Sequence, residues 1–174
     1  VDGGPCSVGV ESTIVDLTET PPRLLRPGGI TLEQLESVLG RVEVDQAVTR
    51  LMSAGEKPRA PGMKYRHYAP KAPVTVVAGP PERTAEHIAR SLTPGDGVIC
   101  FDEFAGEFPG CQIQRMGPAG DKSAQARHIF DALRAFDHTE VPRIWAQCPD
   151  PSGLGLAINN RLNKAAGFHI VEVK

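Results

Sequence analysis

Apolar residues in the second half of the chain fall into two alternating patterns. Short apolar runs typical of strands occupy residues 74–78, 98–101, 112–116, 144–146 and 170–173. Between these runs, apolar residues recur three and four positions apart, which is the spacing of one helix face. Three such faces are present: Ala85, Ile88, Ala89 and Leu92; Ala126, Ile129, Phe130 and Leu133; and Leu154, Ile158, Leu162 and Ala165.

This alternation predicts the fold of residues 71–174. Strands with nearly unbroken apolar runs are typical of parallel sheets that helices cover on both faces. We therefore expect an α/β fold in which residues 71–174 form a three-layer, mostly parallel, Rossmann-like domain. A domain of about 100 residues is an ordinary size for this arrangement.

The first 40 residues predict a hairpin followed by a helix. Residues 8–17 read V-G-V-E-S-T-I-V-D-L and favour a strand, and residues 23–26 read as a short returning strand. Thr31 and Gln34 form a capping-box pattern before a helix with a leucine- and valine-rich face, which Gly40 ends. A hairpin and one helix bury too little surface to fold alone, so we expect residues 1–40 to be the tail of an incomplete α/β domain.

A linker over residues 41–70 separates these two parts. A weak helical pattern spans residues 46–52, and residues 57–70, here called the strap, then read K-P-R-A-P-G-M-K-Y-R-H-Y-A-P. Its three prolines predict an extended, stiff segment that is neither helix nor strand. The strap is either a solvated spacer or, because it combines cations with aromatic rings, a cover for a phosphate and a base.

Composition limits the classes of protein that remain. The 174 residues are 40% hydrophobic and 23% charged, as in soluble globular proteins, and no apolar run approaches the roughly 20 residues that span a bilayer. The net charge of −2 means that any affinity for RNA must come from a local patch. The start V-D-G-G-P-C-S lacks signal-peptide features, and four cysteines without a C-x-x-C pair indicate reduced thiols of a cytoplasmic protein. Neither the cysteines nor the five histidines have the spacing of metal ligands, so we expect no metal site.

Two residues of the first part are candidates for binding. Ser12 lies inside the first predicted strand, where it is either a half-buried strand serine or a residue facing a pocket. Arg26 precedes Pro27-Gly28-Gly29, where an arginine is either solvated or able to bind an oxyanion with two hydrogen bonds. The sequence shows no Ser/His/Asp arrangement and no paired carboxylates, so the catalytic residues stay unknown.

Two glycine-containing turns of the second part are candidates for phosphate binding. Residues 117–123 read G-P-A-G-D-K-S, but Asp121 interrupts the pattern of a phosphate-binding loop. We interpret this turn as a helix start capped by Asp121 or Ser123. The G-L-G of residues 153–155 opens a helix after a strand, where α/β sheets place ligands, and we favour a helix start there too.

Three stretches together resemble one family. The D-G-G of residues 2–4, with G-V-E-S-T-I-V-D-L and L-L-R-P-G-G-I, resembles the end of a YrdC-like domain. The A-P-G-M-K-Y-R-H-Y-A-P of the strap resembles the linker of two-domain, YwlC-type threonylcarbamoyl-AMP synthases. The G-L-G-L-A-I-N-N-R-L-N-K-A-A that begins at residue 153 resembles the closing helix of their C-terminal domain.

The resemblance implies an activity and roles for three residues. The family joins L-threonine, bicarbonate and ATP into threonylcarbamoyl-AMP, releases pyrophosphate with the help of Mg²⁺, and so supplies the threonylcarbamoyl group of a tRNA adenosine. By resemblance, Ser12 helps to bind threonine, Arg26 binds the nucleotide, and Tyr65 of the strap closes over ATP. tRNA or tRNA-modifying proteins are the implied partners. The family's triphosphate-binding residues belong to the front of the YrdC-like domain, so this chain alone is expected to be inactive.

Other functions remain open at this point. Residues 71–174 could form a stand-alone nucleotide-binding or regulatory α/β module, or serve only to orient the strap. A carbamoyltransferase of hydrogenase maturation also contains a YrdC-like domain, but such proteins are expected to carry zinc-finger cysteine pairs, which this sequence lacks.

Overall fold

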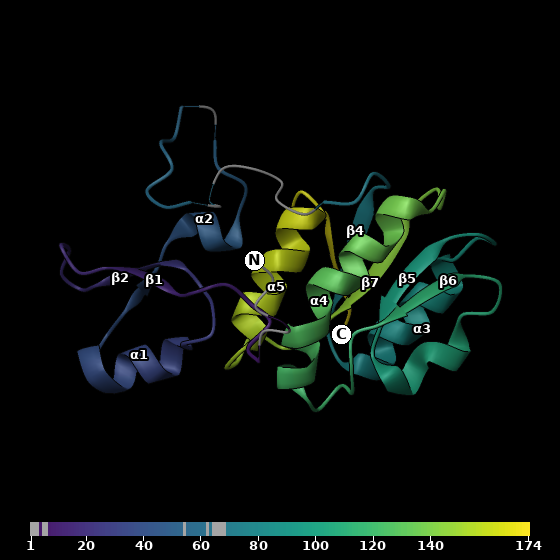
Figure 1. Ribbon diagram of the computed structural model, residues 1–174, viewed down its shortest axis with the longest axis horizontal. Helices are drawn as coiled ribbons and strands as arrows, with labels where there is room; N and C mark the ends of the chain where they lie inside the picture. The colour runs from purple at the N-terminus through teal and green to yellow at the C-terminus, as the bar shows by residue number, and fades with distance from the viewer. Residues whose placement is uncertain (1–3, 5–6, 54, 62, 64–68) are drawn as a thin grey trace.

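The computed structural model describes residues 4, 7–53, 55–61, 63 and 69–174 of the chain. Its strands form two sheets, one of three strands in the order β1-β2-β3 and one of five strands in the order β6-β5-β7-β4-β8. Figure 1 shows the smaller sheet and the larger sheet on opposite sides of helix α5, which spans Gly155–Ala165.

The larger sheet is parallel throughout, as the unbroken apolar runs predict. Each of its pairings runs in the parallel direction. Its strands are β4 (Val74–Ala78), β5 (Gly97–Cys100), β6 (Gln112–Arg115), β7 (Ile144–Cys148) and β8 (Ile170–Glu172). The strands β5 and β7 are buried at every residue, because helices cover both of their faces.

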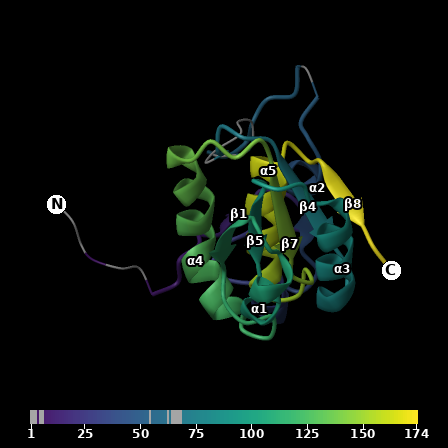
Figure 2. The ribbon, with the colours of Figure 1, turned by 90° about the vertical axis from the view of Figure 1, so that its right-hand side faces the viewer.

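Helices cover both faces of this sheet and complete three layers. Helix α3 (Pro81–Ser91) packs on one face, and α4 (Lys122–Ala135) packs with α5 on the other. Figure 2 shows α3 and α4 on opposite sides of the strands. Short 3₁₀ turns span Asp102–Glu107 and Phe136–His138. The predicted α/β fold is confirmed.

The smaller sheet contains the predicted hairpin and one strand that the sequence pattern did not predict. Strand β1 (Ile14–Asp16) is antiparallel to β2 (Arg23–Arg26), and β3 (Glu43–Val44) joins β2 in parallel. Helix α1 (Leu32–Leu39) begins at the expected capping box, and Gly40 ends it. The weak helical pattern of residues 46–52 becomes α2, a single turn over Gln46–Thr49.

The strand expected over residues 8–17 is wrong in its first half. Residues 8–13 leave the sheet and cross toward the larger domain, where Gly9 lies against the backbone of α4. A Cβ atom on Gly9 would come within 2.3 Å of the Arg127 Cα atom. Gly9 has φ = 79°, a conformation that glycine adopts without steric cost. The neighbouring Val10 is buried in the core of the larger sheet, so the two parts share one hydrophobic cluster.

Helix α1 is amphipathic as predicted, but its apolar face is not buried. Val38 is 82% exposed and Leu39 is 38% exposed. None of the helix residues is buried. Burial of an apolar face is what normally stabilises a short helix, so this face lacks a covering element within the part of the chain that the structure describes.

The described residues of the strap, 57–61, 63, 69 and 70, contain no helix or strand. Ala60 and Met63 are buried against Leu25 and Ala47, so this part of the strap packs on the smaller sheet. Tyr65 lies outside the described residues. No helix in the described part of the chain has the length and apolar character needed to cross a membrane.

Candidate functional site

The structure brings Ser12 and Arg26 into direct contact. The Arg26 Nε atom donates to the Ser12 carbonyl oxygen at 2.9 Å, and its Nη2 atom donates to the Ser12 hydroxyl at 2.9 Å. The hairpin pairing places Arg26 opposite Ile14, so its side chain reaches back to the residue two positions earlier. The two candidates, 14 residues apart in sequence, therefore form one site.

The glycine turn after Arg26 allows this contact. The Gly29 N–H donates to the Glu11 carbonyl at 3.1 Å, and a Cβ atom on Gly28 would lie 2.1 Å from the same oxygen. The Thr13 hydroxyl bonds the Ile30 carbonyl at 2.7 Å and accepts from the Ile30 N–H at 3.0 Å. The turn therefore lies directly against residues 11–13, which only a residue without a side chain permits at Gly28.

The arrangement can bind an anion. Ser12 is exposed and Arg26 is half-buried, so a ligand can approach both from solvent. A guanidinium has five N–H donors in a planar fork that matches carboxylate and phosphate oxygens. The contacts with Ser12 orient this fork and leave donors for an incoming oxyanion.

Helix α5 adds buried charge beside this pair. Arg161, which is 2% exposed, forms an ion pair with Glu11, the residue before Ser12. Lys164, one turn later, is 5% exposed. Burial lowers the pKa of Arg161 to about 10. The neighbourhood of Ser12 thus contains the cations Arg26, Arg161 and Lys164 and the carboxylate of Glu11.

Sequence reasoning missed Glu11, Arg161 and Lys164. Arg and Lys on a helix normally face solvent, and the apolar face of α5 was assigned to Leu154, Ile158, Leu162 and Ala165. In the structure most residues of α5 are buried, because α2 and the segment with Glu11 pack against it in addition to α4, β4 and β7. The Asn160 amide also donates to the Val48 carbonyl at 2.7 Å across this interface. A local sequence pattern does not predict that a second face of α5 is covered in this way.

Replacing Lys164 is expected to stabilise the chain in a pH-dependent way. Burial, together with the positive charges of Arg161 and Arg26, lowers the pKa of Lys164 to about 8. The unfolded chain then binds more protons between about pH 8 and 10, so stability rises with pH across that window. Lys164→Met should raise the free energy of unfolding at pH 7 by up to about 3 kcal/mol.

Denaturant unfolding of wild type and variant at pH 7 and pH 9.5 measures this difference. The gain should be largest at pH 7 and shrink at pH 9.5. The exposed Lys71 gives the matched control, since Lys71→Met should change stability little at either pH. A Lys164→Met gain that is equal at both pH values would contradict a depressed lysine pKa.

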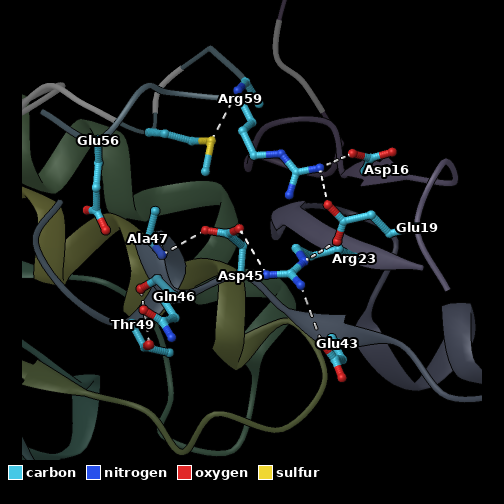
Figure 3. Close-up of polar contacts among 12 residues, drawn as sticks. Asp16, Glu19, Arg23, Glu43, Asp45, Gln46, Ala47, Thr49, Glu56 and Arg59 are labelled. Carbon is cyan, nitrogen blue, oxygen red and sulfur yellow. Dashed lines mark hydrogen bonds and ion pairs between the residues drawn. The ribbon is translucent and has the colours of Figure 1, made fainter. Parts of the chain in front are cut away.

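Ion pairs fasten the strap to the hairpin (Figure 3). Arg59 pairs with Asp16 and, at 2.7 Å, with Glu19. Arg23 pairs with Glu19 at 2.7 Å and extends the network to Glu43 at 3.5 Å. A hydrogen bond from the Thr18 hydroxyl, followed by the Thr18 N–H and the charge of Arg59, holds the pKa of Asp16 below its usual value. The cationic strap predicted from sequence is therefore partly neutralised at Arg59.

A second pair shapes a cavity beside the strap. The Arg50 Nη2 atom lies 2.6 Å from the Glu56 carboxylate, and this hydrogen bond lowers the pKa of Glu56. The cavity has a volume of about 360 Å³, and Lys57, Arg59 and other charged residues line it. The first residues of the strap therefore line a polar cavity.

Replacing Arg59 is expected to loosen the strap at little cost in overall stability. Half-exposed ion pairs contribute about 1 kcal/mol or less, so Arg59→Gln should lower the free energy of unfolding by no more than that. The backbone amides of Lys57, Arg59, Ala60 and Met63 should exchange hydrogen faster, as measured by mass spectrometry. The exposed pair of Arg83 with Glu86 provides the control variant Arg83→Gln. Unchanged exchange in the Arg59 variant would show that the apolar contacts alone hold the strap.

The G-P-A-G-D-K-S turn is a helix start, as interpreted from sequence. The Asp121 carboxylate caps α4 by accepting from the Ala124 N–H at 2.9 Å. The Lys122 Nζ atom bonds Asp150 at 2.7 Å and the Ser152 hydroxyl at 2.6 Å. The hydrogen bond from Lys122, followed by those from the Ser152 hydroxyl and N–H to the same carboxylate, lowers the pKa of Asp150 to about 2. Lys122 thus joins two loops at the ends of parallel strands.

Among the described residues, no group of three His, Cys, Asp or Glu could hold a metal ion. Burial raises the pKa of the Cys100 and Cys148 thiols to about 12, so both stay neutral at ordinary pH. The prediction for Tyr65 remains a prediction, because residues 64–68 lie outside the described part.

Comparison with known proteins identifies relatives along nearly the whole chain. A family model described as "Threonylcarbamoyl-AMP synthase, C-terminal domain" matches residues 30–167. The threonylcarbamoyl-AMP synthase of Bacillus subtilis (strain 168) is 43% identical over 174 residues, which are 98% of this chain and 49% of that protein. The threonylcarbamoyl-AMP synthase of Pyrococcus abyssi (strain GE5 / Orsay) is 42% identical over 99% of this chain and 50% of its own length.

Solved structures of Pyrococcus abyssi Sua5 share the fold. A variant with alanine in place of a histidine and the following tyrosine has a TM-score of 0.87 and 40% identity over 99% of this chain and 49% of that chain. A crystal structure of the complex with L-threonine has a TM-score of 0.80 and 39% identity, and covers 99% of this chain and 50% of that one. This chain spans about half the length of the curated relatives that it matches over nearly all its residues. The chain belongs to the threonylcarbamoyl-AMP synthase family.

Proposed function

We propose that this chain is the C-terminal portion of an enzyme that makes threonylcarbamoyl-AMP from L-threonine, bicarbonate and ATP. The enzyme releases pyrophosphate and supplies the threonylcarbamoyl group for a tRNA adenosine, in the cytoplasm. The observation that carries the proposal is the Ser12–Arg26 contact, which holds a hydroxyl and a guanidinium side by side at an exposed edge. The family relationship supports the same reaction.

Within this proposal each candidate residue has a role. The Ser12 hydroxyl bonds threonine, and the Arg26 guanidinium binds a phosphate of the nucleotide. A relative has a structure in complex with L-threonine, which supports a threonine site in the family. Residues 1–40 are the tail of a YrdC-like domain, residues 41–70 are the linker, and residues 71–174 are the C-terminal domain.

The strap is the proposed lid over ATP. In one solved relative a histidine and the tyrosine that follows it are both alanine. The sequence of this chain contains a single His-Tyr pair, His67-Tyr68, within three residues of Tyr65. The anchoring of the strap by Arg59 fixes one end of this lid against the hairpin that carries Arg26.

Tyr65→Ala in the full-length protein is expected to raise the KM for ATP about tenfold, because a ring stacked on a base contributes roughly 1–3 kcal/mol. Tyr65→Phe keeps the ring and should stay close to wild type. Initial-rate kinetics at varied ATP, with circular dichroism to verify folding, make the comparison. An unchanged KM for ATP in the alanine variant would make the strap a plain spacer.

Mg²⁺ is part of the family's proposed chemistry, but the described residues do not form a site for it. Mg²⁺ prefers carboxylate and phosphate oxygens in octahedral geometry. The charge of Lys164 lies near Arg26, and the nearby carboxylate of Glu11 is paired with Arg161. We therefore assign no Mg²⁺ ligand to this chain.

The test of the proposed function is pyrophosphate release from ATP in the presence of threonine and bicarbonate. The full-length protein should release pyrophosphate only when threonine is present. The isolated 174 residues should release little, because phosphoryl transfer depends on positioning and charge neutralisation that one arginine does not supply. Turnover by the isolated chain at the full-length rate would contradict the assignment of this chain as an incomplete portion.

A stand-alone nucleotide-binding module is the second candidate. A cavity of about 360 Å³ lies at the carboxyl ends of β4 and β7, where open α/β sheets bind ligands. Asp150 and Glu172 line it, and no lysine or arginine is among the described residues of its lining, which disfavours a phosphate. Calorimetry of this chain with ATP and with AMP distinguishes the candidates. Tight binding that survives Arg26→Ala would favour the module.

A further inference from the structure

The segment that carries Ser12 is fastened from two sides. From β2, Arg26 bonds the carbonyl and the hydroxyl of Ser12. From α5, Arg161 pairs with the carboxylate of Glu11. Arg26 belongs to the smaller sheet and Arg161 to the larger domain. Because Glu11 and Ser12 are consecutive, both parts of the protein hold the same short segment.

The Arg161–Glu11 pair is mutually dependent. Arg161 is 2% exposed, and among the described residues both of its Nη atoms lack a hydrogen-bond partner, while Nη2 forms the ion pair with Glu11. A buried guanidinium needs an anion, because the low dielectric of the interior strongly penalises an unpaired charge. Glu11 is the carboxylate that meets this need, so the position of residue 11 follows the position of α5.

The backbone transmits this constraint to the site. The Glu11 carbonyl accepts from the Gly29 N–H at 3.1 Å, which fixes the turn that follows Arg26. A shift of Glu11 therefore moves both Ser12 and the turn that holds Arg26. Reacting groups tolerate little displacement, since a misplacement of about 1 Å can cost about a hundredfold in rate.

We propose that Arg161 is a positioning residue for the substrate site: acting through Glu11, it sets the orientation of Ser12 toward threonine. The larger domain thereby completes a site whose ligand-contacting groups lie on β2 and on the segment before β1. This role rests on the proposed function, in which Ser12 binds threonine. A purely structural role would lower stability and leave threonine binding by the folded protein unchanged.

The experiment uses the full-length protein with the variants Arg161→Met, Arg161→Lys, Glu11→Gln and the double variant Glu11→Gln/Arg161→Met. The double variant removes both charges and keeps a folded protein available if a single unpaired charge prevents folding. Arg90→Met is the control, because Arg90 lies on α3 with a side chain 81% exposed. The readouts are threonine affinity by calorimetry, the KM for threonine and kcat at saturating ATP, and Tm.

Arg161→Met and Glu11→Gln should each weaken threonine binding about tenfold or more, with a smaller loss in kcat. The double variant should lose no more than the worse single variant, because both act through one interaction. Arg161→Lys should recover part of the affinity, and Arg90→Met should match wild type.

Two results would overturn the positioning role of Arg161. The first leaves the proposed function standing, and the second overturns the proposed function as well. If the wild-type protein binds threonine and the folded double variant binds it equally well, the positioning role of Arg161 is wrong and the proposed function stands. If the wild-type protein binds no threonine, the proposed function fails and the positioning role fails with it.

Discussion

Arg26→Ala in the full-length protein is expected to lower kcat/KM for ATP about a hundredfold or more. Removal of a donor aimed at developing phosphate charge typically costs about a hundred- to a thousandfold. The same change removes two hydrogen bonds to Ser12, each contributing about 1 kcal/mol to stability. The measurement is pyrophosphate release at varied ATP, with Tm recorded for the same samples.

The control for this prediction is Arg41→Ala. Arg41 belongs to the same small sheet region, its side chain is 79% exposed, and it pairs only with Glu43 among the described residues. Its loss should leave kinetics and Tm near wild type. If Arg26→Ala lowers Tm and leaves kcat/KM for ATP unchanged, Arg26 is a structural residue of the hairpin.

Gly28→Ala is expected to disrupt the site by displacing the backbone of residues 11–13. The added Cβ atom would lie 2.1 Å from the Glu11 carbonyl oxygen, 2.6 Å from the Thr13 nitrogen and 2.7 Å from the Ser12 carbonyl carbon. These atoms are backbone, so residues 11–13 must move away. We expect a loss of about 1–3 kcal/mol in the free energy of unfolding. We also expect a fall in kcat/KM for threonine of about a hundredfold.

Gly106→Ala is the matched control, because a Cβ atom there meets nothing within 4 Å. Denaturant unfolding and initial-rate kinetics on both variants separate the loss of the close contact from the effect of adding a methyl group. Wild-type activity in Gly28→Ala would mean that the turn does not position Ser12 and Arg26.

Much of the larger domain could be predicted because its elements have strong local patterns. The run V-T-V-V-A became β4, and the face of Ala126, Ile129 and Leu133 became the buried side of α4. The smaller sheet was harder, because β3 contains only Glu43 and Val44 and is too short for any pattern. Residues 8–13 alternate like a strand, but Gly9 and Val10 pack on the larger domain instead.

The candidate site was predictable where chemistry and a glycine turn coincide in sequence. Ser12 and Arg26 were singled out from the sequence, and the hairpin explains why they meet. Glu11 and Arg161 are 150 positions apart, and their pairing depends on how the segment before β1 packs against α5. The sequence places both charges on polar positions, so solvent exposure was the natural expectation for each.

Helix α1 is a second case in which the sequence predicts an element but not the residues that it contacts. The capping box and the leucine spacing correctly predict the helix, because both are local. Neither says what the apolar face contacts, and within the described residues it contacts little.

We propose that the full-length protein makes threonylcarbamoyl-AMP and that this chain supplies Ser12 and Arg26 to the site. Mass spectrometry of the nucleotide products tests it most directly, with ATP, bicarbonate and isotopically labelled threonine as substrates. We predict a labelled threonylcarbamoyl-AMP product from the wild-type protein, and a product formed far more slowly by Arg26→Ala. Formation of unlabelled AMP or ADP alone by the wild-type protein would contradict the account.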